Sequence, residues 1–351
     1  MKVLLVSVKS EVSHGGIAVW TKSYLEGCDL SGIAVDLVNV EMRGQRAADG
    51  TAKRNLLDEV RRTNSILKQL RVFLKKTDCY TVAHLNTSCG SFGLLRDYIV
   101  AKRIVSKGIP LVTHYHCDIP RAIRSERNKR YLGKLVRISK DNLVLCEGSR
   151  LYLEKEFGCS AEKIPNFVDD ALILREGRTV SENLERAFFV GRVGPQKGVA
   201  EIYELARRFP DLTFILVGEV SRDVLQWEKP GNVQLLGGMS HEQVIEQIDR
   251  ADVFIFPSHS EGFSVALLES MARGLPAVAT DVGAAADMLA DGCGLVVKKG
   301  DVDAMERAMR EVQSPVCRQE ISQKAIRKVR ECYTREAVIQ RLVRLYNAEK
   351  E

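Results

Sequence analysis

The stretch His259-Ser-Glu-Gly-Phe-Ser-Val-Ala-Leu-Leu-Glu269 decides the fold of this chain. It places one carboxylate in a loop that leads into a helix and a second carboxylate inside that helix. The apolar run Ala251-Asp-Val-Phe-Ile-Phe-Pro257 precedes it and predicts a buried strand. A helix that begins near Phe263, or at the residue after it, has free backbone N–H groups at its first turn. Such groups bind anions, so this order of strand, polar loop and helix predicts a phosphate site.

The two carboxylates, Glu261 and Glu269, have two interpretations. Helical rise places them about 8 to 10 Å apart along the axis, a separation at which one diphosphate fits between two polyol groups. The alternative is that Glu261 is an acidic first-turn residue that complements the helix dipole, and that Glu269 is an ordinary surface charge.

A second glycine-rich loop, residues 191–198, follows the strand expected at 187–190. Its three glycines allow close backbone approach, and it carries two cations, Arg192 and Lys197. Arginine offers a planar fork of donors and lysine a point charge, a pair suited to a diphosphate and to a leaving group that gains negative charge. The alternative is a solvated basic loop.

These residues, with matching pieces along nearly the whole chain, resemble the retaining glycosyltransferases of family 4, which are built on the GT-B fold. The chain departs from the family pattern at 146–149, 166–169 and 283–287, none of which is a proposed donor-binding position. The resemblance rests on Gly15-Gly16-Ile-Ala, Leu111-Val-Thr-His-Tyr-His-Cys-Asp118, Ile164-Pro-Asn-Phe-Val-Asp169, Val190-Gly-Arg-Val-Gly-Pro-Gln-Lys197, Leu216-Val-Gly218 and the block from Glu261 to Glu269.

The resemblance implies a role for each matching residue. Arg192 and Lys197 would hold the donor diphosphate, Glu269 the ribose hydroxyls, and Glu261 the transferred sugar. The implied catalytic residues are His116, Glu261, Arg192 and Lys197. The implied donor-binding residues are Gly15, Gly16, Arg192, Lys197, Gly218, Glu261, Gly262, Phe263, Ser264, Val265 and Glu269.

Strand and helix signals alternate in two rounds, which predicts an α/β protein with two Rossmann-like, doubly wound parallel sheets. The resemblance to GT-B proteins implies that the two domains face each other across a cleft. The length of 351 residues also exceeds a typical single core. We expect an acceptor-side domain at 1–165, a linker at 166–185 and a donor-binding domain at 186–334. A helix is expected over 323–350, and the resemblance implies that residues from about 335 to 351 pack back on the first domain. Strands are expected at 3–8, 35–38, 81–85, 110–114, 143–145, 187–190, 213–217, 233–236, 253–256, 277–280 and 294–296.

Charge is distributed unevenly along the chain. Residues 1–150 hold 26 Lys and Arg against 14 Asp and Glu, although the net charge of the whole chain is only +6. Apolar residues at helical spacing accompany the basic residues of 53–76 and 121–137, so these segments predict either a surface that binds an anionic membrane or an ordinary solvated face. The region lacks interleaved aromatic residues, which argues against nucleic acid. The cations assigned to the acceptor or membrane side are Arg121, Arg124, Arg127, Lys129 and Arg130.

Several motifs are missing or have a simpler explanation. No stretch approaches the roughly 20 apolar residues of a membrane span, and residues 1–8 predict a first strand rather than a signal peptide. Nine cysteines without C-x-x-C spacing indicate a reducing compartment, so we expect a cytoplasmic protein. If the basic flank binds lipid, the protein is peripheral on the inner face of the membrane. No G-x-G-x-x-G follows the first strand, which argues against a dinucleotide cofactor. Asp301-Val-Asp303 has the form of a metal-binding Asp-x-Asp, but Asp301 is placed to cap a helix, and we expect no metal.

The function expected is metal-independent transfer of a hexose, with retention, from a nucleoside diphosphate sugar to a hydroxyl acceptor. A UDP-sugar is the co-substrate we favour, no other cofactor is expected, and the acceptor could be a lipid-linked molecule or a glycan at the membrane. The alternatives are a nucleotide-sugar epimerase or phosphorylase on the same fold, and a transferase-like protein that binds without catalysis. Donor consumption without an acceptor, or with phosphate as acceptor, would separate the first pair from a transferase.

Overall fold

The computed structural model of the protein describes residues 1–9, 16–41, 56–75, 79–90 and 93–348. The chain forms two compact units. The N-terminal unit comprises Met1–Asn166 together with the C-terminal segment Arg335–Glu351, and the C-terminal unit comprises Phe167–Thr334.

The N-terminal unit contains a six-stranded parallel sheet with the order β2-β1-β3-β4-β5-β6. Its strands are β1 (Lys2–Ser7), β2 (Ala34–Asn39), β3 (Val82–Thr87), β4 (Leu111–Tyr115), β5 (Asp141–Val144) and β6 (Glu162–Lys163). Its helices are α1 (Gly16–Leu30), α2 (Leu56–Phe73), α3 (Gly93–Val105), α4 (Ile119–Ala122), α5 (Glu126–Ile138), α6 (Glu147–Phe157) and α13 (Arg335–Asn347).

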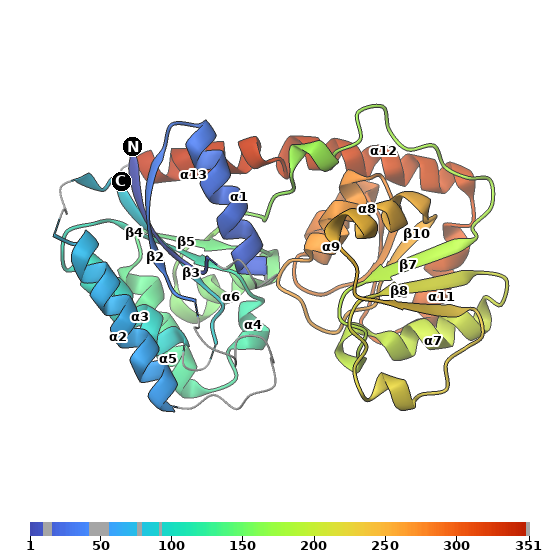
Figure 1. The fold of residues 1–351 in the computed structure, drawn as a ribbon, viewed down its shortest axis with the longest axis horizontal. Helices are drawn as coiled ribbons and strands as arrows, with labels where there is room; N and C mark the ends of the chain where they lie inside the picture. Colours follow the sequence, from blue (N-terminus) through green and yellow to red (C-terminus); the bar gives the residue numbers. More distant parts are fainter. Residues whose placement is uncertain (10–15, 42–55, 76–78, 91–92, 349–351) are drawn as a thin grey trace. The chain divides into compact units, whose positions relative to one another are not determined.

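Helices cover both faces of this sheet, which explains why its central strands are buried throughout, polar residues included. Every residue of β3 and of β4 is buried, as expected for parallel strands that have helices on both sides. Helices α2, α3 and α5 lie on one face, and α1 and α13 lie on the other (Figure 1).

The C-terminal unit repeats this architecture with a six-stranded parallel sheet in the order β12-β11-β10-β7-β8-β9. Helices α7 and α11 lie on one face of it, and α8, α9 and α12 on the other (Figure 1). The strands are β7 (Arg186–Val190), β8 (Thr213–Val217), β9 (Val233–Gly237), β10 (Val253–Phe256), β11 (Ala277–Thr280) and β12 (Leu295–Val297). The helices are α7 (Val199–Arg208), α8 (His241–Arg250), α9 (Val265–Ala272), α10 (Ala285–Leu289), α11 (Val302–Glu311) and α12 (Pro315–Cys332), with short 3₁₀ turns η3 (Asp170–Leu172), η4 (Pro195–Lys197), η5 (Val224–Gln226) and η6 (Ala290–Gly292).

The expectation of two doubly wound parallel sheets is confirmed, and each expected strand is present with its ends shifted by at most two residues. The sequence did not reveal β6, because its two residues, Glu162 and Lys163, carry no apolar signal. The single helix expected over 323–350 is wrong. The chain forms α12 and α13, and the helix is interrupted at Tyr333, whose carbonyl oxygen accepts a hydrogen bond from the Val168 N–H at 3.0 Å.

Arg318 on α12 ties this helix to the segment that leads into β7. Its side chain is fully buried. Nη1 donates to Val312 O at 2.6 Å and Gln313 O at 2.8 Å, and Nη2 donates to Ser181 O at 2.6 Å and Glu182 O at 3.3 Å. One guanidinium therefore donates to four carbonyl oxygens from two segments of the chain.

We expect Arg318→Met to lower the free energy of unfolding by about 3 kcal/mol, because four hydrogen bonds from a buried charged group are lost and the Val312 carbonyl is left buried without its donor. Chemical denaturation measures it. The matched control is Arg307→Met on the exposed side of α11, which should change stability by no more than about 0.5 kcal/mol. Equal effects of the two variants would contradict the assigned role of Arg318.

Candidate functional site

The order of the C-terminal sheet brings the two predicted donor loops together. Strand β7 lies between β8 and β10, so the chain leaves β7 toward one side of the sheet and β10 toward the other, and a crevice opens between the loops that follow them. Lys197 lies in the loop after β7, and Glu261 in the loop after β10. Their side chains form an ion pair, Lys197 Nζ with Glu261 Oε1, and are 29% and 19% exposed. Ser258 Oγ also donates to Glu261 Oε1, at 3.3 Å.

Three further contacts hold these loops against each other. Gly198 has φ +74°, and a Cβ atom there would lie 2.1 Å from Pro257 O, so only glycine permits this close approach. The His259 N–H donates to Gln196 O at 3.0 Å. The His259 ring nitrogen Nε2 lies 2.6 Å from Glu201 Oε1, in the first turn of α7. The loops therefore form one fixed surface around the ion pair.

The N-terminus of α9, which follows the Glu261 loop directly in sequence, has free donors. Ser264 is the N-cap, and its hydroxyl accepts from the Leu267 N–H at 3.1 Å. The N–H groups of Val265 and Ala266 have no hydrogen-bond partner among the residues that the structure describes. This confirms the expected helix start. The alternative that Glu261 belongs to the first turn is wrong, because the first turn of α9 contains no acidic residue.

The other predicted donor residues lie around this crevice. Gly218, after β8, has φ +137°, and a Cβ there would meet Gly191 O at 1.9 Å. The loops after β7 and β8 are thus in backbone contact. Arg192 is exposed, and within the described ranges its side chain makes no ion pair or hydrogen bond. Gly262 is half-buried, and its carbonyl accepts from the Ala284 N–H at 3.0 Å, while Phe263 is buried.

Glu269 is not an ordinary surface charge. It lies inside α9, its side chain is 12% exposed, and its Oε1 is 2.8 Å from Nε2 of His241. His241 is the first residue of α8 and was not predicted as a site residue. The hydrogen bond that His241 donates to Glu269 is the largest cause of a raised His241 pKa. The Ser240 and Gln243 capping box, visible in the sequence, could have placed His241 at a helix start.

In the N-terminal unit, His116 follows β4 at the carboxyl edge of the sheet. Its Nε2 lies 3.0 Å from Asn86 Oδ1, and the Trp20 ring packs edge-on against the imidazole with 5.2 Å between the ring centroids. Burial lowers the pKa of His116 to about 3, and a hydrogen bond with the Asn166 side chain opposes this shift. The imidazole is therefore neutral at physiological pH. His84 and His114, on β3 and β4, are both fully buried.

The glycine loop and the basic flank are less complete. Gly15 lies outside the described residues, and Gly16 is the exposed first residue of α1. In the basic flank, Arg121 Nε forms an ion pair with Asp118 at 3.2 Å, and Lys129 pairs with Glu156. Arg124 donates to a backbone oxygen, that of Arg121, at 3.2 Å. Arg124, Arg127 and Arg130 are exposed.

Asp301 caps α11, as expected, since its Oδ1 accepts from the Ala304 N–H at 2.8 Å. Across the part of the chain that the structure describes, no three His, Cys, Asp or Glu side chains gather as metal ligands.

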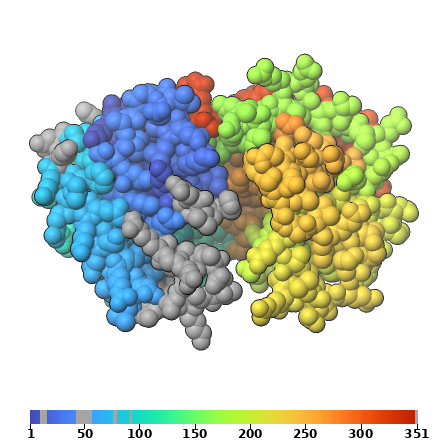
Figure 2. Space-filling model, viewed as in Figure 1, coloured from blue at the N-terminus to red at the C-terminus, as the bar shows by residue number. Residues whose placement is uncertain are grey.

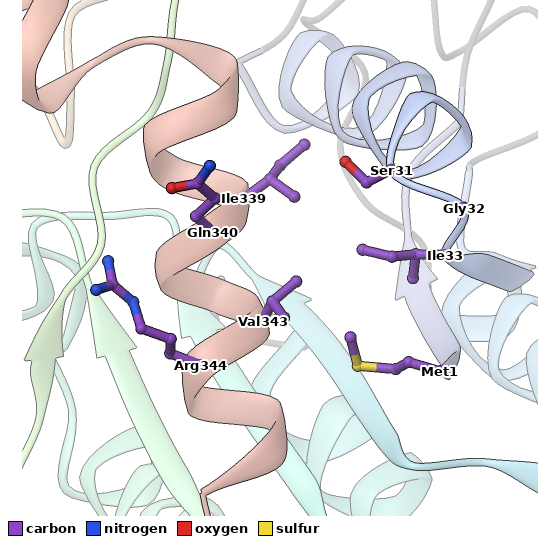
Figure 3. Close-up of a pocket in the computed structure, with 8 residues that line it drawn as sticks. All are labelled: Met1, Ser31, Gly32, Ile33, Ile339, Gln340, Val343 and Arg344. Atoms are coloured by element: carbon purple, nitrogen blue, oxygen red, sulfur yellow. The ribbon is translucent and has the colours of Figure 1, made fainter.

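A groove of about 520 Å³ lies between α13 and the turn that joins α1 to β2 (Figure 3). In the close-up, Ile339 and Val343 extend from α13 toward Ile33 and Met1. Met1 and Ile33 precede β1 and β2, so the groove lies at the amino ends of these strands, the opposite edge of the sheet from His116. None of the predicted site residues lines it.

The His241 contact gives a titration test. A pKa raised in the folded protein means that protonated His241 stabilises the fold at low pH, and this contribution is lost as the pH rises through the folded pKa. In an NMR titration, we expect His241 to titrate above about 6.5, its ordinary value, and Glu269→Gln to lower its pKa. Glu242→Gln, the control at a weaker neighbouring charge, should lower it less. An unchanged His241 pKa in Glu269→Gln would contradict the contact.

Residues 173–328 match the family model described as glycosyl transferases group 1. A phosphatidyl-myo-inositol mannosyltransferase of Mycolicibacterium smegmatis is 30% identical over 219 residues, which are 57% of this chain and 55% of that protein. The chain thus spans little more than half of that relative's length. An uncharacterised glycosyltransferase of Methanocaldococcus jannaschii is 24% identical over 68% of this chain and 75% of its own.

Solved structures share the fold over nearly the whole chain. A sucrose-phosphate synthase from Thermosynechococcus elongatus superposes with a TM-score of 0.79 at 17% identity, covering 98% of both chains. Anabaena HepE, in a complex with UDP and glucose, superposes with a TM-score of 0.70 at 16% identity, also over 98% of both chains. The chain therefore has the two-sheet GT-B fold, and its C-terminal unit matches the group 1 glycosyl transferases.

Proposed function

We propose that the protein is a retaining glycosyltransferase of family 4 that moves a hexose from a nucleoside diphosphate sugar to a hydroxyl acceptor. The observation that carries this proposal is the juxtaposition of Lys197 and Glu261 beside the free N–H groups at the N-terminus of α9. Cationic and N–H donors for a diphosphate meet a carboxylate that can accept from sugar hydroxyls, at the edge of the sheet where open α/β folds bind ligands.

The residues of this site match the charge changes of the reaction. As the bond between the anomeric carbon and the diphosphate oxygen breaks, negative charge grows on the diphosphate. Arg192, Lys197 and the α9 N–H groups stabilise that charge, the main electrostatic task in such a transfer. The acceptor oxygen bonds to the anomeric carbon, and its proton passes to the departing diphosphate. Glu261 orients the sugar, and Glu269 binds the ribose, which would displace His241.

UDP is the nucleotide we favour. Anabaena HepE, a structural neighbour, is described in complexes with UDP and with UDP-glucose. Relatives whose names specify mannosyl and N-acetylglucosaminyl transfer support a hexose as the group transferred.

A lipid-linked or glycan acceptor at an anionic membrane is the second part of the proposal. Two relatives are named for phosphatidylinositol acceptors. Helix α2 lies at the surface of the N-terminal unit (Figure 2) and exposes Leu57, Val60 and Val72 by 62%, 52% and 64%. None of the helices in the described ranges is both long and apolar enough to cross a membrane. We therefore propose a cytoplasmic enzyme that binds the inner face peripherally.

We expect Lys197→Ala and Glu261→Ala each to cut sugar transfer by a factor on the order of 100 or more. For Lys197 this is the range found when one donor to a developing oxyanion is lost, and for Glu261 it is the cost of a sugar misplaced by about 1 Å. Turnover with a nucleotide-sugar panel measures this. Lys299→Ala, an exposed lysine of the same unit, should keep full turnover. Near-normal turnover in either site variant, with a folded protein, would contradict the assignment.

We propose that the transfer needs no metal, in keeping with the capping role of Asp301. Turnover after treatment with EDTA should equal that of the untreated enzyme, because Lys197, Arg192 and the α9 N-terminus supply the positive charge. A tenfold loss that Mg²⁺ or Mn²⁺ restores would contradict this.

A further inference from the structure

A buried polar network lies beneath His116 in the N-terminal unit, and the donor chemistry does not use it. Its members come from β1, α1, β3 and the returning C-terminal helix α13, and all are at most 4% exposed. They are Ser7, Thr21, Tyr24, His84, Asn86 and Tyr346.

The direction of every hydrogen bond in this network follows from one backbone oxygen. The Thr21 hydroxyl donates to Ile17 O at 2.7 Å, which uses its single proton. Ser7 Oγ, 2.6 Å from Thr21 Oγ1, must therefore donate to Thr21. With its own proton used, Ser7 accepts from Asn86 Nδ2 at 2.9 Å. The amide of Asn86 is thus oriented with Oδ1 on the side away from Ser7.

Asn86 Oδ1 then fixes the protons of two histidines. It lies 3.0 Å from Nε2 of His84 and 3.0 Å from Nε2 of His116. Because a carbonyl oxygen only accepts, both Nε2 atoms carry hydrogen. Burial lowers the pKa of each ring to about 3, so each has one ring proton at neutral pH and a bare Nδ1.

Tyr346 completes the chain from the opposite end. Its hydroxyl lies 2.6 Å from His84 Nδ1, and since Nδ1 is bare, Tyr346 donates. Having given its proton, Tyr346 accepts from the Tyr24 hydroxyl at 3.0 Å. Without the Tyr346 proton, His84 has two unfavourable alternatives. If it keeps its tautomer, Nδ1 is a buried acceptor with no donor. If it changes tautomer, a bare Nε2 lies against Asn86 Oδ1. Rotating the Asn86 amide relieves that repulsion and forces His116 into the other tautomer.

We propose that Tyr346 is a positioning residue that, through His84 and Asn86, holds His116 as the Nε2–H tautomer with Nδ1 as an acceptor. The inference rests on the proposed function in one respect, the assignment of His116 to the active site. A His116 held in this way accepts a hydrogen bond from a hydroxyl or amide and is no general acid. The C-terminal helix thereby sets the chemistry of a residue more than 200 positions earlier in the sequence.

The test is Tyr346→Phe, which removes one hydroxyl and keeps the ring. Long-range ¹H–¹⁵N spectra, assigned with single histidine substitutions, report which ring nitrogen is protonated. In the wild type, we expect His84 and His116 to show protonated Nε2 and bare Nδ1 between about pH 6 and 8, well above their lowered pKa values. In Tyr346→Phe, we expect a second tautomer at both rings. The kcat for transfer should fall roughly tenfold, less than the ~100-fold cost of a group misplaced by 1 Å, with the KM for the donor unchanged.

Tyr24→Phe is the matched control. It removes the other hydroxyl of the hydrogen bond between Tyr24 and Tyr346, and it leaves Tyr346 free to donate its proton to His84. It should retain the wild-type tautomers and kcat. If Tyr24→Phe changed the tautomers and kcat as much as Tyr346→Phe does, the effect would come from altered packing, and the proposal would be overturned. Unchanged tautomers in Tyr346→Phe would also overturn it. A protonated Nδ1 at His84 or His116 in the wild type overturns it without any variant, even if Tyr346→Phe fails to fold. Absence of transfer by the wild type would defeat the proposed function, but the spectra would still decide the network.

Discussion

The contact between the loops after β7 and β10 is the constraint on which the candidate site depends. These strands are neighbours in the sheet although more than 60 residues separate them in sequence, and their loops leave the sheet in opposite directions. Gly198 lets the backbone of one loop touch Pro257 of the other, and that contact fixes the distance across which Lys197 and Glu261 pair. A bulkier residue at 198 would separate the cation from the carboxylate and from the N-terminus of α9.

The two units organise their candidate site residues in different ways. In the C-terminal unit, four of the charged side chains at the candidate site are already paired, Lys197 with Glu261 and His241 with Glu269, while Arg192 is exposed. A ligand there exchanges partners instead of meeting isolated charges, which lowers the cost of keeping the site ready. In the N-terminal unit, burial keeps His84 and His116 neutral, and hydrogen bonds with one allowed direction fix where each proton lies. One site is organised by charge and the other by proton position.

The sequence predicted the sheets well because apolar runs of four to six residues mark parallel strands buried on both faces. It missed β6, whose two charged residues form a short edge strand beside β5. It also missed the break after α12, where the N–H of Val168, from a distant segment, donates to the Tyr333 carbonyl oxygen. The loop residues Lys197 and Glu261 were predictable from their motifs. The roles of His241 and His259 were not predictable, because their contacts with Glu269 and Glu201 join segments 28 and 58 residues apart, which no local pattern encodes.

The most direct test of a nucleotide-sugar site is thermal stabilisation by UDP, GDP, ADP and their common sugar conjugates, measured on the wild type and on Lys197→Ala. A ligand at 100 times its dissociation constant adds about 2.7 kcal/mol to the free energy of unfolding, enough for a clear shift in Tm. The account predicts that one nucleotide series, UDP first, stabilises the wild type and not the variant. No shift with any nucleotide, or equal shifts in both proteins, would contradict it.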